Sequence, residues 1–120
     1  MAKVLIVDDT ISELELIRQF LDEKGYTVIS ATDAKSALTK ASEQKPDVVV
    51  TDVVMPGMSG FELCRSLKNN PDTKNVPIII LSSKNQELDR LWAMKQGADV
   101  YLTKPVTSEQ LIRAVKSVAD

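Results

Sequence analysis

Short apolar runs alternate along the chain with longer stretches in which apolar residues recur every three or four positions. The runs have the length of strands and are rich in β-branched residues. Several of them are apolar at nearly every position, which is typical of parallel strands buried on both faces. The pattern predicts five strands, at Lys3–Val7, Thr27–Ala31, Asp47–Thr51, Ile78–Leu81 and Val100–Thr103.

The stretches between these runs carry the signals of helices. The first has one apolar stripe and is followed by Gly25, a residue type that helix C-termini favour. Further helices are expected at about 33–43, 60–68 and 86–96. The last begins at Thr107, because Gln110 three residues later completes a capping-box pattern. The stripe of the first helix consists of Ile11, Leu14, Ile17, Phe20 and Leu21.

This alternation of strands and helices predicts an α/β fold in which a doubly wound parallel sheet carries helices on both faces. A chain of 120 residues suits one domain, which we place at residues 1–120. Ligands of such sheets bind at the carboxyl ends of the strands. Polar residues at those ends are therefore the candidates for chemistry.

Acidic residues follow two of the predicted strands. Asp8 and Asp9 come directly after the first strand, and Asp52 follows the third. If these strands are neighbours, the carboxylates meet in a small volume, where mutual repulsion raises their pKa values. A hard divalent cation such as Mg²⁺, Ca²⁺ or Mn²⁺ would relieve that repulsion. The alternative is that Asp8 and Asp9 form only a helix cap and a turn.

Hydroxyl and basic side chains follow two other strands. Ser82 and Ser83 end the fourth strand, and Lys104 follows the fifth. The bond from Lys104 to Pro105 can be cis at low cost, which would turn the lysine toward the carboxylates. A lysine beside carboxylates and a cation suits a phosphate. The alternative for Lys104 alone is a surface lysine ahead of a helix-initiating proline, and the alternative for Ser82 alone is a serine at a strand end with no ligand.

The composition narrows the chemistry further. The chain has no histidine, which excludes catalytic triads and histidine-ligated zinc. A single cysteine, Cys64, cannot form an internal disulfide, and no apolar run is long enough to be a signal peptide or a membrane span. A net charge of −2 gives no indication of nucleic-acid or membrane binding. We therefore expect a cytoplasmic protein whose chemistry uses carboxylates, lysine, hydroxyls and a cation.

The residues at the strand ends resemble, in order and over the whole chain, those of bacterial response-regulator receiver domains of the chemotaxis type. The matching residues are Asp8–Asp9, Asp52 with the segment Met55-Pro56-Gly57-Met58-Ser59-Gly60, Ser82, and Lys104–Pro105. The resemblance implies a flavodoxin-like (βα)₅ fold with a five-stranded parallel sheet in the order 2-1-3-4-5.

The resemblance also implies a role for each matching position. Asp52 would be the phosphoacceptor, and Lys104 would pair with the phosphoryl oxygens. Ser82, with Ser83 beside it, would bind the phosphoryl group, and Tyr101 would be the aromatic residue that moves with Ser82. The ligands of Mg²⁺, or alternatively Mn²⁺, would be Asp8, Asp9, Asp52 and the backbone carbonyl of Val54.

The function implied is that of a stand-alone response regulator in a two-component phosphorelay, and not of an enzyme with a free substrate. The phosphodonor would be a sensor histidine kinase or a histidine-containing phosphotransfer protein, since this chain has no histidine. Phosphorylation would switch the surface of helix four, strand five and helix five for an unknown protein target. The chain would be a monomer or a phosphorylation-dependent dimer, with no nucleic acid and no membrane as partner.

Three further positions carry narrower expectations. Val54 and Lys84 stand where the family tunes phosphoryl lifetime. The apolar Val54 cannot orient an attacking water, so we expect slow dephosphorylation. The stretch from Ser83 to Tyr101 is similar to that of receivers of the twitching-motility and phototaxis type. Within it, we expect Trp92 to pack on its own helix face rather than to anchor a partner.

Three alternatives remain open. A phosphatase of the haloacid-dehalogenase type also uses an aspartyl phosphate, but it has an acid two residues after the nucleophile, where this chain has Val54. A flavodoxin-like nucleotide or flavin binder needs a phosphate-cradling loop, whereas Asp8-Asp9-Thr10 stands at that place. The third alternative is a receiver that no longer accepts phosphate.

Overall fold

The computed structural model describes residues 2–119. Over this range the chain alternates strands and helices as the sequence predicts, with β3 moved by one residue and β4 extended to Ser82. The elements are β1 (Lys3–Val7), α1 (Ile11–Asp22), β2 (Thr27–Ala31), α2 (Ala34–Gln44), β3 (Val48–Asp52), α3 (Gly60–Lys68), β4 (Ile78–Ser82), α4 (Glu87–Lys95), β5 (Val100–Thr103) and α5 (Ser108–Ala119).

In the described part of the chain the strands form one parallel sheet in the order β2-β1-β3-β4-β5. This order confirms the predicted doubly wound α/β fold. It makes β1 and β3 neighbours, with Val7 opposite Thr51. The residues that follow Val7 and Thr51 are Asp8 and Asp52, so the pairing brings the two acids to the same edge of the sheet.

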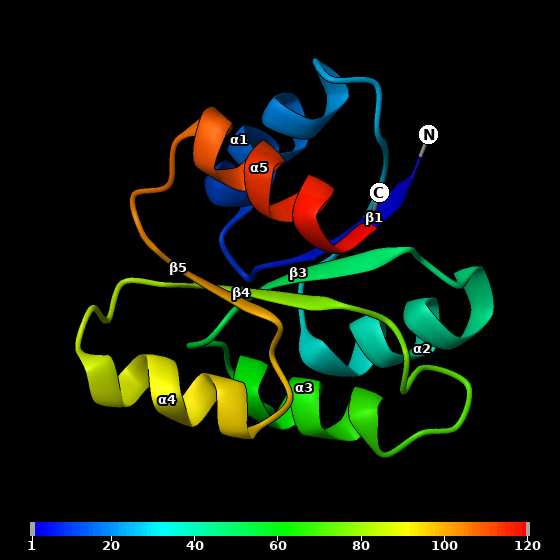
Figure 1. Cartoon of the computed structure of the whole chain (residues 1–120). Helices are drawn as coiled ribbons and strands as arrows, with labels where there is room; N and C mark the ends of the chain where they lie inside the picture. Colours follow the sequence, from blue (N-terminus) through cyan, green and yellow to red (C-terminus); the bar gives the residue numbers. More distant parts are fainter. Residues whose placement is uncertain (1, 120) are drawn as a thin grey trace.

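The helices cover both faces of the sheet. Figure 1 shows α1 and α5 on one face and α2, α3 and α4 on the other. Because side chains of a strand alternate between faces, Val4 and Ile6 pack in the core below α1 and α5. Leu5 and Val7 point the other way, into the core of α2, α3 and α4. Both sides of the central strands are therefore buried, which explains their nearly continuous apolar sequences.

Local signals hold the helices in place largely as predicted. The Thr107 hydroxyl accepts from the backbone of Gln110 at 3.1 Å, and the Gln110 side chain accepts from the backbone of Thr107 at 2.9 Å. Gly25 follows α1 with a φ of 84°, which glycine adopts without strain. The predicted stripe of α1 is partly wrong, because Ile11 at the first position of the helix is 60% exposed. Within residues 2–119, no helix combines the length and apolar character needed to span a lipid bilayer.

Candidate functional site

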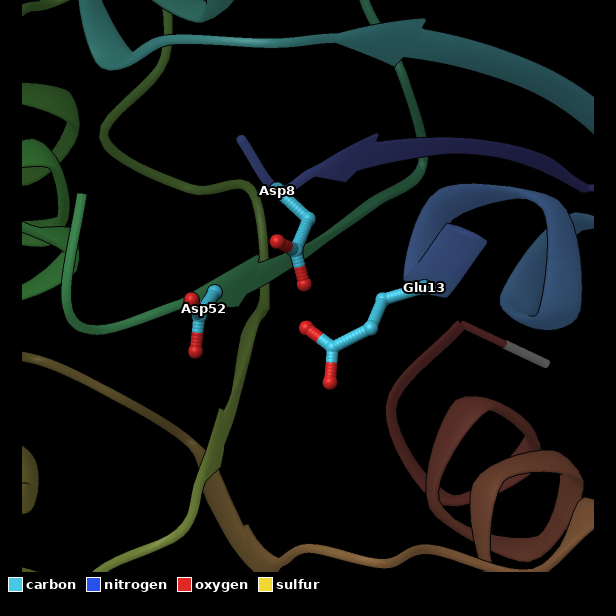
Figure 2. Close-up of side chains that lie close together, drawn as sticks. All are labelled: Asp8, Glu13 and Asp52. Atoms are coloured by element: carbon cyan, nitrogen blue, oxygen red, sulfur yellow. The ribbon is translucent and has the colours of Figure 1, made fainter. Parts of the chain in front are cut away.

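The carboxyl ends of β1 and β3 place acidic side chains side by side. Among residues 2–119, Asp8, Glu13 and Asp52 have carboxylate oxygens that all lie within 4.8 Å of one another. Figure 2 shows the side chains pointing into one volume, Asp8 from the end of β1, Asp52 from the end of β3 and Glu13 from the first turn of α1. We call this group the carboxylate cluster.

Lys104 lies among these carboxylates. Its ammonium donates to Glu13 at 2.9 Å, to Asp52 at 3.0 Å and to Asp8 at 3.3 Å. The peptide bond between Lys104 and Pro105 is cis. One ammonium against the carboxylates of Asp8, Glu13 and Asp52 leaves the site with a net formal charge of −2 when all are ionised. The site is therefore built to attract a cation.

Burial and charge shift the acid–base behaviour of this group. The pKa of Asp8 is raised to about 6, mainly by burial and further by the nearby carboxylates of Glu13 and Asp52. The hydrogen bond from the Thr10 N–H and the charge of Lys104 lower this pKa, but by less. Burial also opposes the charge on Lys104, but Glu13, Asp52 and Asp8 more than offset it, so its pKa is raised. The Lys104 ammonium lowers the pKa of Glu13.

Four further residues predicted for the site, Asp9, Val54, Ser83 and Lys84, are not members of the carboxylate cluster. Asp9 is exposed and is not a member of the carboxylate cluster. Val54, whose backbone carbonyl is a predicted ligand, has a side chain that is 69% exposed. Ser83 and Lys84 are exposed as well. The roles predicted for these residues stay predictions.

Ser82 and Tyr101 are linked through one backbone segment. Ser82 is buried at the end of β4, and its hydroxyl accepts from the N–H of Lys84 at 3.1 Å. The carbonyl of the same Lys84 accepts from the Tyr101 hydroxyl at 2.7 Å. A displacement of Lys84 therefore disturbs both bonds, although Ser82 and Tyr101 stand on different strands.

The loop after Asp52 is closed tightly on itself. The N–H of Gly60, the first residue of α3, donates to the carbonyl of Val53 at 2.8 Å. A Cβ on Gly60 would lie only 2.0 Å from the Asp52 carbonyl oxygen. Only glycine therefore allows α3 to begin this close to the strand that carries Asp52.

Glu13 belongs to the site although the sequence analysis did not single it out. Its carboxylate accepts the shortest of the Lys104 bonds. A weak signal was present, because Glu13 stands in the first turn of the helix that follows Asp8. Such acids are common at helix N-termini for another reason, their favourable interaction with the helix dipole, so position alone did not distinguish it.

Comparison with known proteins identifies the class. A family model described as the response regulator receiver domain matches residues 4–116, so the chain belongs to this family. Protein PilH of Pseudomonas aeruginosa is 41% identical over 118 residues, which are 98% of this chain and 98% of that protein. Response regulator PleD of Caulobacter vibrioides is 36% identical, and the match covers 98% of this chain but 26% of that protein.

Solved structures agree with this assignment. A putative response regulator from Chloroflexus aurantiacus superposes with a TM-score of 0.94 at 31% identity, covering 98% of this chain and 97% of that one. The chemotaxis protein CheY4 of Vibrio cholerae gives a TM-score of 0.93 at 36% identity, with 98% of both chains covered. The protein is thus a receiver domain of two-component signalling. Members of this family bind Mg²⁺ through acidic residues, and the carboxylate cluster offers such residues.

Proposed function

We propose that this receiver accepts a phosphoryl group on Asp52 from a phosphohistidine of a partner kinase or phosphotransfer protein, in a reaction that depends on Mg²⁺. The observation that carries the proposal is the contact of Asp52 with Lys104 at 3.0 Å beside Asp8 and Glu13. An acid, a lysine and further acids at one strand edge are the groups that phosphoryl transfer to a carboxylate requires.

The chemistry is a displacement at phosphorus. A carboxylate oxygen of Asp52 forms the new O–P bond, the bond from phosphorus to the donor breaks, and the donor leaves with the electron pair. Attack of one anion on another is unfavourable, and the Lys104 ammonium reduces the repulsion by pairing with the transferring oxygens. Asp52 is also only 14% exposed, which limits competing contacts with water.

The residues present fit a hard divalent cation. The carboxylates of Asp8, Glu13 and Asp52 supply oxygen ligands only, which Mg²⁺ and Mn²⁺ prefer. Asp9, which follows Asp8 in the chain, and the carbonyl of Val54 are the further ligands that we propose. When bound, the cation supplies positive charge that offsets the repulsion between Asp52 and the incoming phosphoryl group.

We further propose that Lys84 relays the change from Ser82 to Tyr101. Phosphorylation adds close to two negative charges and new acceptor oxygens at the site. A Ser82 hydroxyl that donates to these oxygens moves away from its bond with the Lys84 N–H. Because the Lys84 carbonyl accepts the hydrogen bond of the Tyr101 hydroxyl, a shift of Lys84 breaks this bond and the Tyr101 side chain changes its hydrogen-bond partner or its position.

The face of α4, β5 and α5 is the surface that we propose for the protein target. Tyr101 lies on β5, which contacts α4. The α4 helix carries exposed apolar side chains, with Leu88 75%, Leu91 50% and Trp92 48% exposed. The packing of Trp92 on its own helix face stays a prediction, and its exposure leaves part of the indole open to a partner. Exposed aromatic and aliphatic residues on one helix suit a partner surface more than a solvated one.

The test is incubation of the protein with acetyl phosphate, with and without Mg²⁺, followed by intact mass spectrometry. The wild type is expected to gain one phosphoryl group only with Mg²⁺, and Asp52→Asn is expected to gain none. The emission of Trp92, the only tryptophan of the chain, is expected to change with phosphorylation in the wild type and to change less in Tyr101→Phe. A wild-type mass that never rises would contradict the proposal. Turnover of a small phosphate ester would favour a phosphatase.

A further inference from the structure

Glu13 shares Lys104 with the phosphoacceptor. The hydrogen bond from Lys104 to Glu13 is 2.9 Å long and the one to Asp52 is 3.0 Å long, so the two carboxylates bind the ammonium at nearly equal distance. We propose that Glu13 is a positioning residue that restrains phosphorylation of Asp52, because it competes for Lys104 and places a negative charge beside the incoming phosphoryl group. The inference rests on the function proposed above and adds a regulating residue to the same site.

The lysine has no donor to spare. An ammonium carries three N–H donors, and here they are directed to Asp8, Glu13 and Asp52. Lys104 can therefore donate a strong hydrogen bond to a phosphoryl oxygen only when one of these carboxylates loses its own hydrogen bond to the ammonium. Replacement of Glu13 by a neutral amide of the same shape weakens its hold on Lys104, since a bond to a charged acceptor is about twice as strong as one to a neutral acceptor.

Glu13 is the carboxylate of the cluster that is most open to water. Its side chain is 42% exposed, against 14% for Asp52 and 8% for Asp8. With Lys104 and Pro105 it lines a pocket of about 100 Å³ beside α1. Glu13 can therefore turn outward without leaving a buried charge unpaired, whereas Asp8 and Asp52 cannot. This freedom makes it the partner that yields when a phosphoryl group arrives.

The charge of Glu13 has a second effect of opposite sign. Its oxygens lie within 4.8 Å of those of Asp8 and Asp52, so the negative charge attracts a divalent cation to the site. The same charge repels a phosphoryl donor, which is itself an anion. Removal of the charge is thus expected to weaken Mg²⁺ binding and to speed phosphorylation once Mg²⁺ is saturating. A merely structural defect would slow phosphorylation at every Mg²⁺ concentration.

The experiment compares wild type, Glu13→Gln and the control Glu15→Gln. Glu15 lies two residues further along α1 and is exposed, so its replacement removes the same charge outside the site. Mg²⁺ affinity is measured by isothermal titration calorimetry without a phosphodonor, and the rate of phosphoryl gain from acetyl phosphate by intact mass. Circular dichroism checks that the variants are folded.

For Glu13→Gln we expect the Mg²⁺ dissociation constant to rise, and the rate at saturating Mg²⁺ to rise as well, each by about three- to tenfold, as for a charge at a partly exposed site. Glu15→Gln is expected to match the wild type in both. A rate in Glu13→Gln that is equal to or below that of the wild type would overturn this inference alone. A wild type that gains no phosphoryl group would overturn the proposed function and this inference together.

Discussion

Replacement of Asp8 by asparagine is expected to stabilise the metal-free protein above about pH 6, although it removes a bond to Lys104. Burial raises the pKa of Asp8 from its ordinary value of 3.8 to about 6. Between these values the folded carboxyl group binds more protons than the unfolded one, so the free energy of unfolding falls as the pH rises. Above about pH 6 the charged carboxylate is a net cost that asparagine does not have.

The size of the effect follows from the pKa of Asp8. Each pKa unit corresponds to about 1.4 kcal/mol, so the rise to about 6 amounts to about 3 kcal/mol. Water and salt at the open edge of the site screen part of this, and we expect about 1.5 kcal/mol. Glu13, whose pKa is lowered by Lys104, acts in the opposite sense, because its stabilisation is lost as the pH falls through its lowered pKa.

The assay is urea unfolding in the presence of a chelator, followed by far-UV circular dichroism from about pH 4 to about pH 8. Asp8→Asn should be more stable than the wild type at the upper end and should lose the decline between about pH 4 and 6. The control is Asp9→Asn, since Asp9 is adjacent and exposed, and it should stay within about 0.5 kcal/mol of the wild type. An Asp8→Asn protein that is less stable than the wild type at pH 8 would refute the reasoning.

Three further substitutions test other parts of the structure. Gly60→Ala is expected to lower the free energy of unfolding by about 3 kcal/mol or more, measured in urea, because the added Cβ would meet the Asp52 carbonyl at 2.0 Å. Gln110→Ala is expected to cost about 0.5 kcal/mol in thermal melting, since the Thr107 N–H loses its partner at the start of α5. Val54→Asn is expected to speed the loss of the phosphoryl group from Asp52 about tenfold, because the amide would orient the attacking water through one hydrogen bond, and a bond of about 1.4 kcal/mol in the transition state corresponds to that factor. Equal decay rates in Mg²⁺ buffer would remove that last idea.

The sequence was sufficient for the elements of this fold because several independent signals agreed. Apolar runs marked the strands, and the capping box at Thr107 marked the start of α5, whose first residue is Ser108. The order of the strands in the sheet could not be predicted from such local signals. Periodicity does not determine which strands are neighbours, and the order came from the resemblance to a family. The pairing of β1 with β3, on which the site depends, is therefore the step that local patterns alone did not supply.

The site was predicted in part, and the differences have a simple physical cause. Asp8 and Asp52 meet as expected because they stand at the carboxyl ends of the neighbouring strands β1 and β3. Lys104 reaches them from the end of β5, at the same edge of the parallel sheet but separated from β3 by β4. Asp9 is exposed, since it lies in the bend between the end of β1 and the start of α1, where the sheet and its covering helices no longer bury the chain. Glu13 reaches the site from a helix, and its approach depends on how α1 lies across the sheet, which no spacing in the sequence specifies.

The two loops that leave the site differ in how far they can yield. The loop after Asp52 is closed by a hydrogen bond from the Gly60 N–H to the Val53 carbonyl at 2.8 Å, and the start of α3 packs against the end of β3 without space for a Cβ on Gly60. The loop after Ser82 is held by single hydrogen bonds, in which the Lys84 N–H donates to the Ser82 hydroxyl, the Tyr101 hydroxyl donates to the Lys84 carbonyl, and the Gln86 N–H donates to Asp89 in the first turn of α4. If Asp52 is phosphorylated as we propose, we therefore expect the resulting displacement in the loop between β4 and α4 and not in the loop between β3 and α3.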